Sequence, residues 1–185
     1  MKLLETGRVL GVDADLVAIP ILLLVIPLVI GFIGGLSIPA TLGFIVSILL
    51  LQGLAPPAGI ALGLPVYLLI PFLVSVAAGV ILLIYRLCDV FSEKSAWLKS
   101  KIAKVKELMD KHPAMHSYGE IALIALMWVP GLGLYGTPIL AWILNWRGPR
   151  AVLLMLTGWL IACLVVLGMA QGVLTLLFPP PPGVK

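Results

Sequence analysis

Charged side chains are scarce in this sequence of 185 residues, where Asp, Glu, Lys and Arg together make up 11%. None of them, and no His, occurs from Leu16 to Tyr85, from Ile121 to Trp146 or from Ala151 to Val184. Hydrophobic residues make up 62% and the mean hydropathy is +1.20, outside the usual range of soluble domains. The sequence therefore predicts an all-α integral membrane protein with a single membrane domain over residues 1–185.

Cysteine and histidine are also few, with two of each. Cys88 and Cys163 lie in or beside apolar segments and lack C-x-x-C spacing, so we interpret them as packing residues. His112 and His116 lie in a polar stretch that contains Pro113, and no buried acid is available to partner them. These absences argue against a hydrolytic or metal centre, and we expect neither enzymatic activity nor a cofactor.

Helix-breaking residues interrupt the apolar segments at two places. Segments 16–36, 66–87 and 151–172 are long enough to cross a bilayer, which takes about 20 residues. Segment 121–146 is broken by the Gly- and Pro-rich run 130–138, which leaves about 10 apolar residues before it and about nine after it. Segment 41–52 is too short to span and ends at a second break. We predict three spanning helices and two re-entrant helical hairpins.

The order of short helix, break, short helix and spanning helix occurs twice, in repeat 1 (41–87) and repeat 2 (120–178). Because each hairpin returns to its own face and the next helix crosses, the second repeat starts on the opposite face. Such inverted repeats are typical of secondary transporters, whose site lies where the broken helices meet. Residues 1–40 form an N-terminal helix whose apolar run is too long for a signal peptide.

Basic residues indicate the orientation. In this topology 11 of the 12 fall on one side of the membrane, and only Lys185 falls on the other. The positive-inside rule makes the populated side cytoplasmic. We expect a multi-pass protein of the cell membrane with its N-terminus in the cytoplasm and its C-terminus outside. Topology thus explains the net charge of +4, and we expect no nucleic-acid partner.

Residues 88–119, between the repeats, predict a cytoplasmic amphipathic helix. Leu98, Ile102, Val105 and Met109 share one face, and lysines occupy the others. Such a helix fits the anionic headgroup plane or caps the protein itself. Residues 179–185 form a Pro-rich tail to which we assign no chemistry.

Thr137 and Pro138 are residue types that are preferred at the N-cap and at the first position of a helix, respectively. Placed at the tip of the second hairpin, such a helix start would direct free N–H groups into the membrane and could bind an anion. The first hairpin could place a similar helix start, near Ala58 and Gly59, opposite the one at Thr137. The alternative is that these glycines and prolines only allow tight packing. The candidate substrate-binding residues are Gly131, Gly133, Tyr135, Gly136, Thr137, Gln52, Pro57 and Gly59.

Charged residues flank the second hairpin. Glu120 precedes it, and Arg147 and Arg150 follow it. Because the hairpin returns to one face, these three side chains can lie close together. They predict either an ion pair that closes the base of the hairpin or a gate at the cytoplasmic face.

The two breaks resemble those of the small multi-drug export family, which is itself similar to the DedA/VTT class of re-entrant membrane proteins. Tyr118-Gly119 followed by 130–137 is similar to the family's Y-G and P-G-T-G-A-W-T-G, and 59–65 matches its G-I-A-L-G-L-P. The resemblance covers about 50–172 of the chain. It implies two facing re-entrant loops and, for the wider class, movement of lipids or lipid-linked phosphates.

The chain departs from this family at one motif. Leu51 and Gly53 stand where E-L-R-G-A-I-P usually carries Glu and Arg. An intramembrane acid is the usual proton relay or cation-binding group, so its absence argues against proton coupling and against export of cationic drugs.

Two functions therefore remain open. The first is a transporter or flippase-like facilitator for an anionic substrate such as a lipid-linked phosphate. The retained Gly and Pro residues at the hairpin tips favour this function. The alternative is a non-transporting structural subunit or assembly factor, which Leu51 and Gly53 favour. We expect membrane lipids as partners. We also expect a homodimer or other membrane subunits, because two G-x-x-x-G pairs, at 31 and 35 and at 168 and 172, permit close helix approach.

Overall fold

The computed structural model describes residues 12–94, 121–129 and 133–177, and every regular element in these ranges is a helix. The elements are α1 (Val12–Pro20), the π-helical η2 (Ile21–Val25), α2 (Ile26–Ile33), α3 (Ile38–Leu51), the 3-10 turn η3 (Gln52–Leu54), α4 (Pro56–Ala61), α5 (Val66–Lys94), α8 (Ala122–Leu126), α9 (Gly133–Ile143) and α10 (Pro149–Leu177). The predicted all-α class is confirmed for this part of the chain. Gly131, Glu120, most of the predicted amphipathic helix and the Pro-rich tail lie outside the described residues.

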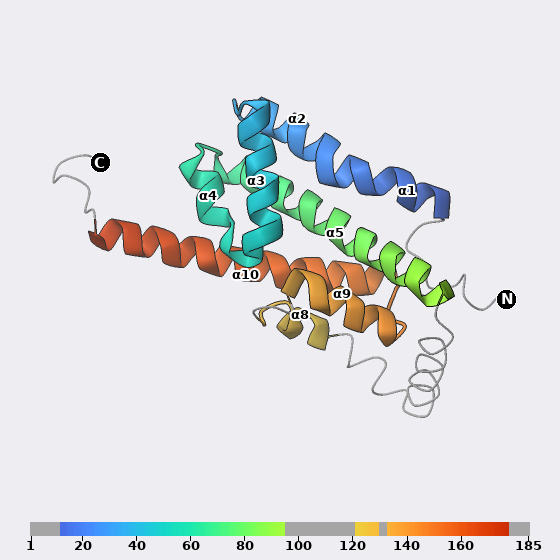
Figure 1. Cartoon of the computed structure of the whole chain (residues 1–185). Coiled ribbons are helices and arrows are strands. Elements are labelled where there is room, and N and C mark those ends of the chain that lie inside the picture. The colour runs from blue at the N-terminus through green and yellow to red at the C-terminus, as the bar shows by residue number, and fades with distance from the viewer. Residues whose placement is uncertain (1–11, 95–120, 130–132, 178–185) are drawn as a thin grey trace.

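Three helical stretches are long and apolar enough to cross a membrane: Leu16–Ile33, Val66–Ser92 and Pro149–Ala170. They correspond to the three predicted spans. Figure 1 shows them side by side, with α5 running in the opposite direction to α1–α2 and α10. The first is interrupted by the π-helical η2 between Pro20 and Pro27, where the missing proline N–H groups disturb the regular hydrogen-bond ladder.

The central helix is α5. Of its membrane-length window 61% is buried inside the protein, compared with 17% for the first span and 33% for α10. The helix continues to Lys94, beyond Leu87, where the predicted span ends. No Gly or Pro occurs between Tyr85 and Lys94, and the helix therefore has no local reason to stop there.

We name α3, η3 and α4 the first short-helix pair. Ser37 caps α3 by accepting a hydrogen bond from the Ala40 N–H at 3.4 Å. The helix stops at Gln52, and Pro56 then starts the six-residue α4. In Figure 1 the two helices run in opposite directions and their junction lies against α10. Gly63, with a φ of 88°, turns the chain into α5.

We name α8 and α9 the second short-helix pair. The two helices pack on different long helices, α8 on α10 and α9 on α5. The contact of α8 with α10 needs Gly158, because a Cβ at that position would lie 2.6 Å from the carbonyl oxygen of Ile124. Asn145, with a φ of 60°, turns the chain after α9 toward α10. The described residues thus contain two pairs of short helices, each followed by a long helix.

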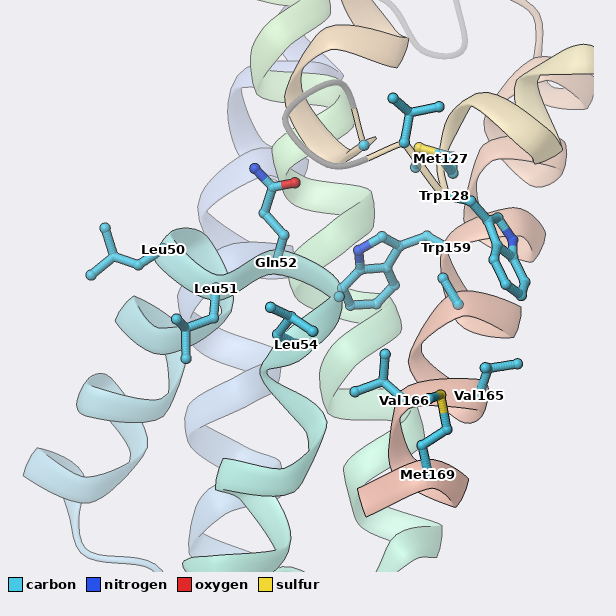
Figure 2. Close-up of a pocket in the computed structure, with 14 residues that line it drawn as sticks. Leu50, Leu51, Gln52, Leu54, Met127, Trp128, Trp159, Val165, Val166 and Met169 are labelled. Atoms are coloured by element: carbon cyan, nitrogen blue, oxygen red, sulfur yellow. The ribbon is translucent and has the colours of Figure 1, made fainter. Parts of the chain in front are cut away.

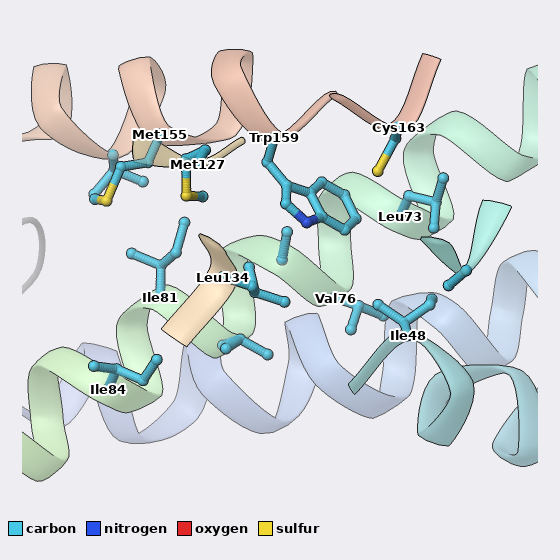
Figure 3. Close-up of a cluster of buried hydrophobic side chains, with 14 of the residues drawn as sticks. Ile48, Leu73, Val76, Ile81, Ile84, Met127, Leu134, Met155, Trp159 and Cys163 are labelled. Atoms are coloured by element: carbon cyan, nitrogen blue, oxygen red, sulfur yellow. The ribbon is translucent and has the colours of Figure 1, made fainter. Parts of the chain in front are cut away.

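Side chains from α3, α5, α9 and α10 share one core, shown in Figure 3. Among them Ile48, Val76, Leu134, Met155 and Trp159 are at most 1% exposed. The shared core holds the start of α9 close to the end of α3, and this contact positions the candidate site.

The first predicted G-x-x-x-G pair is not a helix face in the structure. Gly31 is buried in α2, where a Cβ would lie 2.4 Å from the Thr41 hydroxyl oxygen. Gly35 has a φ of 77° and lies in the turn after α2. We predicted that these two glycines form one face of a helix that is open to a partner. This geometry was wrong, because Gly31 packs against Thr41 within the chain and Gly35 lies outside the helix.

Candidate functional site

A cavity of about 470 Å³ lies where the two short-helix pairs meet α10. Figure 2 shows its walls: the break after α3, the end of α8, the start of α9 and one face of α10. Its size is that of a site for a small organic molecule. The lining residues are Leu50, Leu51, Gln52, Gly53, Leu54, Met127, Trp128, Val129, Gly133, Trp159, Ala162, Val165, Val166 and Met169.

The lining is almost wholly apolar. No charged side chain is among the described residues that form it. Gln52 contributes an amide, and the two indoles come from Trp128 and Trp159. The Trp159 Nε1 is buried and has no hydrogen-bond partner in the described part of the chain.

Gln52 stands at the break between α3 and η3 with a φ of 52° and a ψ of −123°. Its backbone N–H still donates to the Ile48 carbonyl, and its own carbonyl accepts from the Ala55 N–H at 3.1 Å. A positive φ is strained for a residue with a side chain and persists only where the surroundings fix it. The break in the helix at Gln52 is therefore held in place by the surrounding structure.

Gly133, the first residue of α9, faces Gln52 from the other short-helix pair. A Cβ at Gly133 would lie 2.8 Å from the Gln52 Oε1, closer than real Cβ contacts allow. The glycine therefore leaves the space that the Gln52 amide occupies. The structure brings these two predicted site residues together at the cavity wall.

Tyr135 links the two short-helix pairs. Its hydroxyl donates a hydrogen bond to the backbone carbonyl of Leu49 in the last turn of α3. The last four carbonyls of an α-helix have no hydrogen-bond donor within the helix, and the Leu49 carbonyl is one of them. Tyr135 is not among the residues that line the cavity. Its predicted role as a substrate contact remains a prediction.

The predicted helix start at Thr137 was wrong. α9 begins four residues earlier, at Gly133, and both Thr137 and Pro138 lie inside it. Glycine weakens a helix without forbidding helical backbone at Gly133 and Gly136, and the missing Pro138 N–H costs α9 one internal bond. Thr137 is fully buried, and its hydroxyl has no hydrogen-bond partner in the described residues. It therefore cannot act as an N-cap.

The first short-helix pair also differs from the prediction. α4 starts at Pro56, with Pro57 in its first turn, and Gly59 lies inside the helix instead of at its start. A Cβ at Gly59 would lie 2.5 Å from the Leu69 side chain and 2.6 Å from that of Phe44. Gly59 serves close packing, as the alternative interpretation of these residues proposed. Neither Pro57 nor Gly59 lines the cavity, and neither does Gly136.

Arg147 has a partner that the sequence interpretation missed. Its Nη1 donates to the Asp89 carboxylate at 2.6 Å, and the Trp142 indole N–H donates to the same oxygen at 3.0 Å. The guanidinium also stacks on the Trp142 ring at 4.6 Å. This cluster joins the end of α9 to α5. Arg147 therefore forms an ion pair with Asp89 of α5, whereas the predicted pairing with Glu120 involves a residue outside the described ones and stays a prediction.

One further bond reinforces this junction. The Tyr85 hydroxyl, one helical turn before Asp89, donates to the Trp146 carbonyl at 3.1 Å. Arg150 lies in the first turn of α10. The described residues contain no group of His, Cys, Asp and Glu that could hold a metal ion.

Two comparisons find nothing similar, since no curated protein and no solved structure matches the chain. A family model does match, over residues 52–165, and its description is "Putative small multi-drug export protein". The matched range runs from Gln52 at the first break to Val165 on α10 and so includes most of the cavity wall. The chain belongs to this small multi-drug export protein family.

Proposed function

We propose that this chain is a membrane transporter and that the cavity between its two short-helix pairs holds the transported molecule. The observation that carries the proposal is the position of the cavity. It lies where two helix breaks, 81 positions apart between Gln52 and Gly133, face one another. Membership of an exporter family, which is not a class of enzymes, supports the same function.

We propose further that the short-helix pairs are re-entrant hairpins of an inverted repeat. α3 has 14 residues and so is about 21 Å long, whereas the hydrocarbon core is about 30 Å thick. Irregular backbone is tolerated at membrane depth where it is buried in protein or lines a cavity, and Gln52 satisfies this condition. The opposite directions of α5 and α10 fit repeats of inverted topology (Figure 1).

The orientation belongs to the same proposal. We place the protein in the cell membrane with its N-terminus in the cytoplasm, because the basic residues then obey the positive-inside rule. Arg147 and Arg150 follow α9 and so mark the cytoplasmic end of the second hairpin. The cluster of Asp89, Trp142 and Arg147 would then close the hairpin at the cytoplasmic face, where a gate was predicted.

The predicted anionic, lipid-linked phosphate substrate gains little support from the cavity. Its described lining offers no cation to neutralise a phosphate, and burial of an unpaired ion is costly. The predicted helix start at Thr137 is also absent. The relationship to the DedA/VTT class, from which this substrate was inferred, stays a prediction from the sequence.

Transport of a small amphipathic molecule can be measured without knowledge of the energy source. Purified protein is reconstituted into liposomes loaded with methylumbelliferyl glucoside or methylumbelliferyl phosphate, which share one apolar body. External glucosidase or phosphatase converts each released molecule into a fluorescent product. A transporter releases at least one of them faster than protein-free liposomes do. Equal release of both with and without protein would contradict the proposal and favour the structural-subunit alternative.

A further inference from the structure

The polar wall of the cavity is concentrated at Gln52. Its side chain is half-buried at the junction of the two short-helix pairs, and no described residue forms a hydrogen bond with its amide. An amide offers two N–H donors and one carbonyl acceptor, so it can bind either kind of uncharged polar group. A strained backbone that presents an unpaired amide to an apolar cavity indicates a ligand contact rather than a packing residue.

Gly133 supports the same conclusion from the other side of the junction. Any larger residue there would displace the Gln52 amide, since a Cβ would lie 2.8 Å from its Oε1. The free space at Gly133 therefore has a specific use. It lets the amide remain beside the start of α9, at the edge of the cavity.

Apart from the Trp159 indole N–H, the wall that α10 contributes is apolar. Ala162, Val165, Val166 and Met169 line it from successive turns of α10, as Figure 2 shows for the three labelled residues Val165, Val166 and Met169. Leu51 and Gly53 beside Gln52 add no charge. An ion placed between these walls would lose its hydration without gaining a partner of opposite charge from the described lining residues.

We propose that the cavity takes an uncharged amphiphile, with its apolar body against α10 and a hydroxyl or carbonyl group hydrogen-bonded to the Gln52 amide. The inference deepens the proposed transport function by naming its substrate class, and it rests on that function. Gln52 is then the residue that determines specificity, and Gly133 positions it.

The test is binding of methylumbelliferyl glucoside to the full chain in lipid nanodiscs, measured by fluorescence anisotropy. The uncharged glucoside should bind more tightly than methylumbelliferyl phosphate to the unmodified protein. Gln52→Leu keeps the side-chain size and should weaken glucoside binding about fivefold, the effect of one neutral hydrogen bond. Thr157→Val, which removes a hydroxyl from the exposed face of α10, is the matched control and should bind as the unmodified protein does.

A second pair of variants separates positioning from folding. Gly133→Ala should weaken glucoside binding because it displaces the amide, but it should add nothing in a Gln52→Ala background, where no amide remains. Tighter binding of the phosphate, or unchanged glucoside affinity in both Gln52→Leu and Gly133→Ala, would overturn the inference. Failure of the transport proposal looks different: the selective binding persists while the liposomes release neither molecule.

Discussion

The Tyr135 hydroxyl in α9 donates a hydrogen bond to the backbone carbonyl of Leu49 in α3. This bond joins the two short-helix pairs directly beside the cavity. Leu49 lies in the last turn of α3, where carbonyls lack partners within the helix. The second pair therefore completes the hydrogen bonding of the first, and the cavity wall depends on both.

Loss of this bond should destabilise the junction. Tyr135→Phe leaves the ring in place and removes only the hydroxyl, so we expect the free energy of unfolding to fall by about 1 kcal/mol. The change can be measured by denaturant unfolding in detergent micelles. Tyr67→Phe, at a side chain that is 74% exposed, is the control and should unfold like the unmodified protein. Equal effects of the two substitutions would show that the junction does not depend on the hydroxyl.

Asp89 and Arg147 should be energetically coupled. Their side chains are 17% and 14% exposed, so water replaces a lost partner poorly. Asp89→Asn and Arg147→Gln should each lower the free energy of unfolding by about 2 kcal/mol, as expected for a hydrogen bond between charged groups. The double variant should lose less than the sum, by about 1 kcal/mol. Strict additivity in this cycle would contradict the described pairing.

Two glycines of α10 should respond in opposite directions to alanine. Gly158→Ala forces a Cβ against the Ile124 backbone and should cost about 1–3 kcal/mol, because backbone atoms cannot move aside cheaply. Gly168→Ala meets nothing within 4 Å and should instead raise the free energy of unfolding by about 0.5–1 kcal/mol. Thermal unfolding of both variants checks the packing of α8 on α10. Similar melting temperatures for the two would argue against that contact.

A carboxylate at Leu51 should change which ions the cavity accepts. Leu51 lines the cavity and stands where the family resemblance implies a Glu. Leu51→Glu should therefore increase binding of tetraphenylphosphonium, an apolar cation, severalfold, because an acid at the wall of an apolar cavity attracts a cation strongly. The matched control is Thr157→Glu on the exposed face of α10. An equal gain in both variants would mean that a carboxylate outside the cavity binds the cation equally well.

The sequence predicted the long helices well, because a bilayer-spanning helix is specified by the length of an apolar run alone. It also predicted the first break from its Gly and Pro residues, whereas the second predicted break, 130–138, is helical from Gly133 onward and otherwise lies outside the described residues. The exact start of α9 was missed, since Thr137-Pro138 satisfies the local rule for a helix start while Gly133 allows the helix to begin earlier. Local patterns identify a break but do not fix its boundaries.

Contacts between distant segments were harder to predict. Asp89 lies in an apolar stretch 58 positions before Arg147, and only the packing of α9 on α5 brings them together. Trp159 lines the cavity as well, although it lies inside the apolar segment 151–172 and away from both predicted breaks. Gln52 and Gly133 could be identified as candidates from their places at the breaks, but their mutual contact required the fold.

The most direct test of this account is glucoside release from liposomes in which the cavity has been filled. Val166→Trp places a large side chain inside the cavity. Leu164→Trp is the control, because Leu164 is 43% exposed and does not line the cavity. We expect the unmodified protein and Leu164→Trp to release methylumbelliferyl glucoside faster than protein-free liposomes. We expect Val166→Trp to fall to the protein-free rate while remaining folded. Full release by folded Val166→Trp would contradict the claim that the transported molecule passes through this cavity.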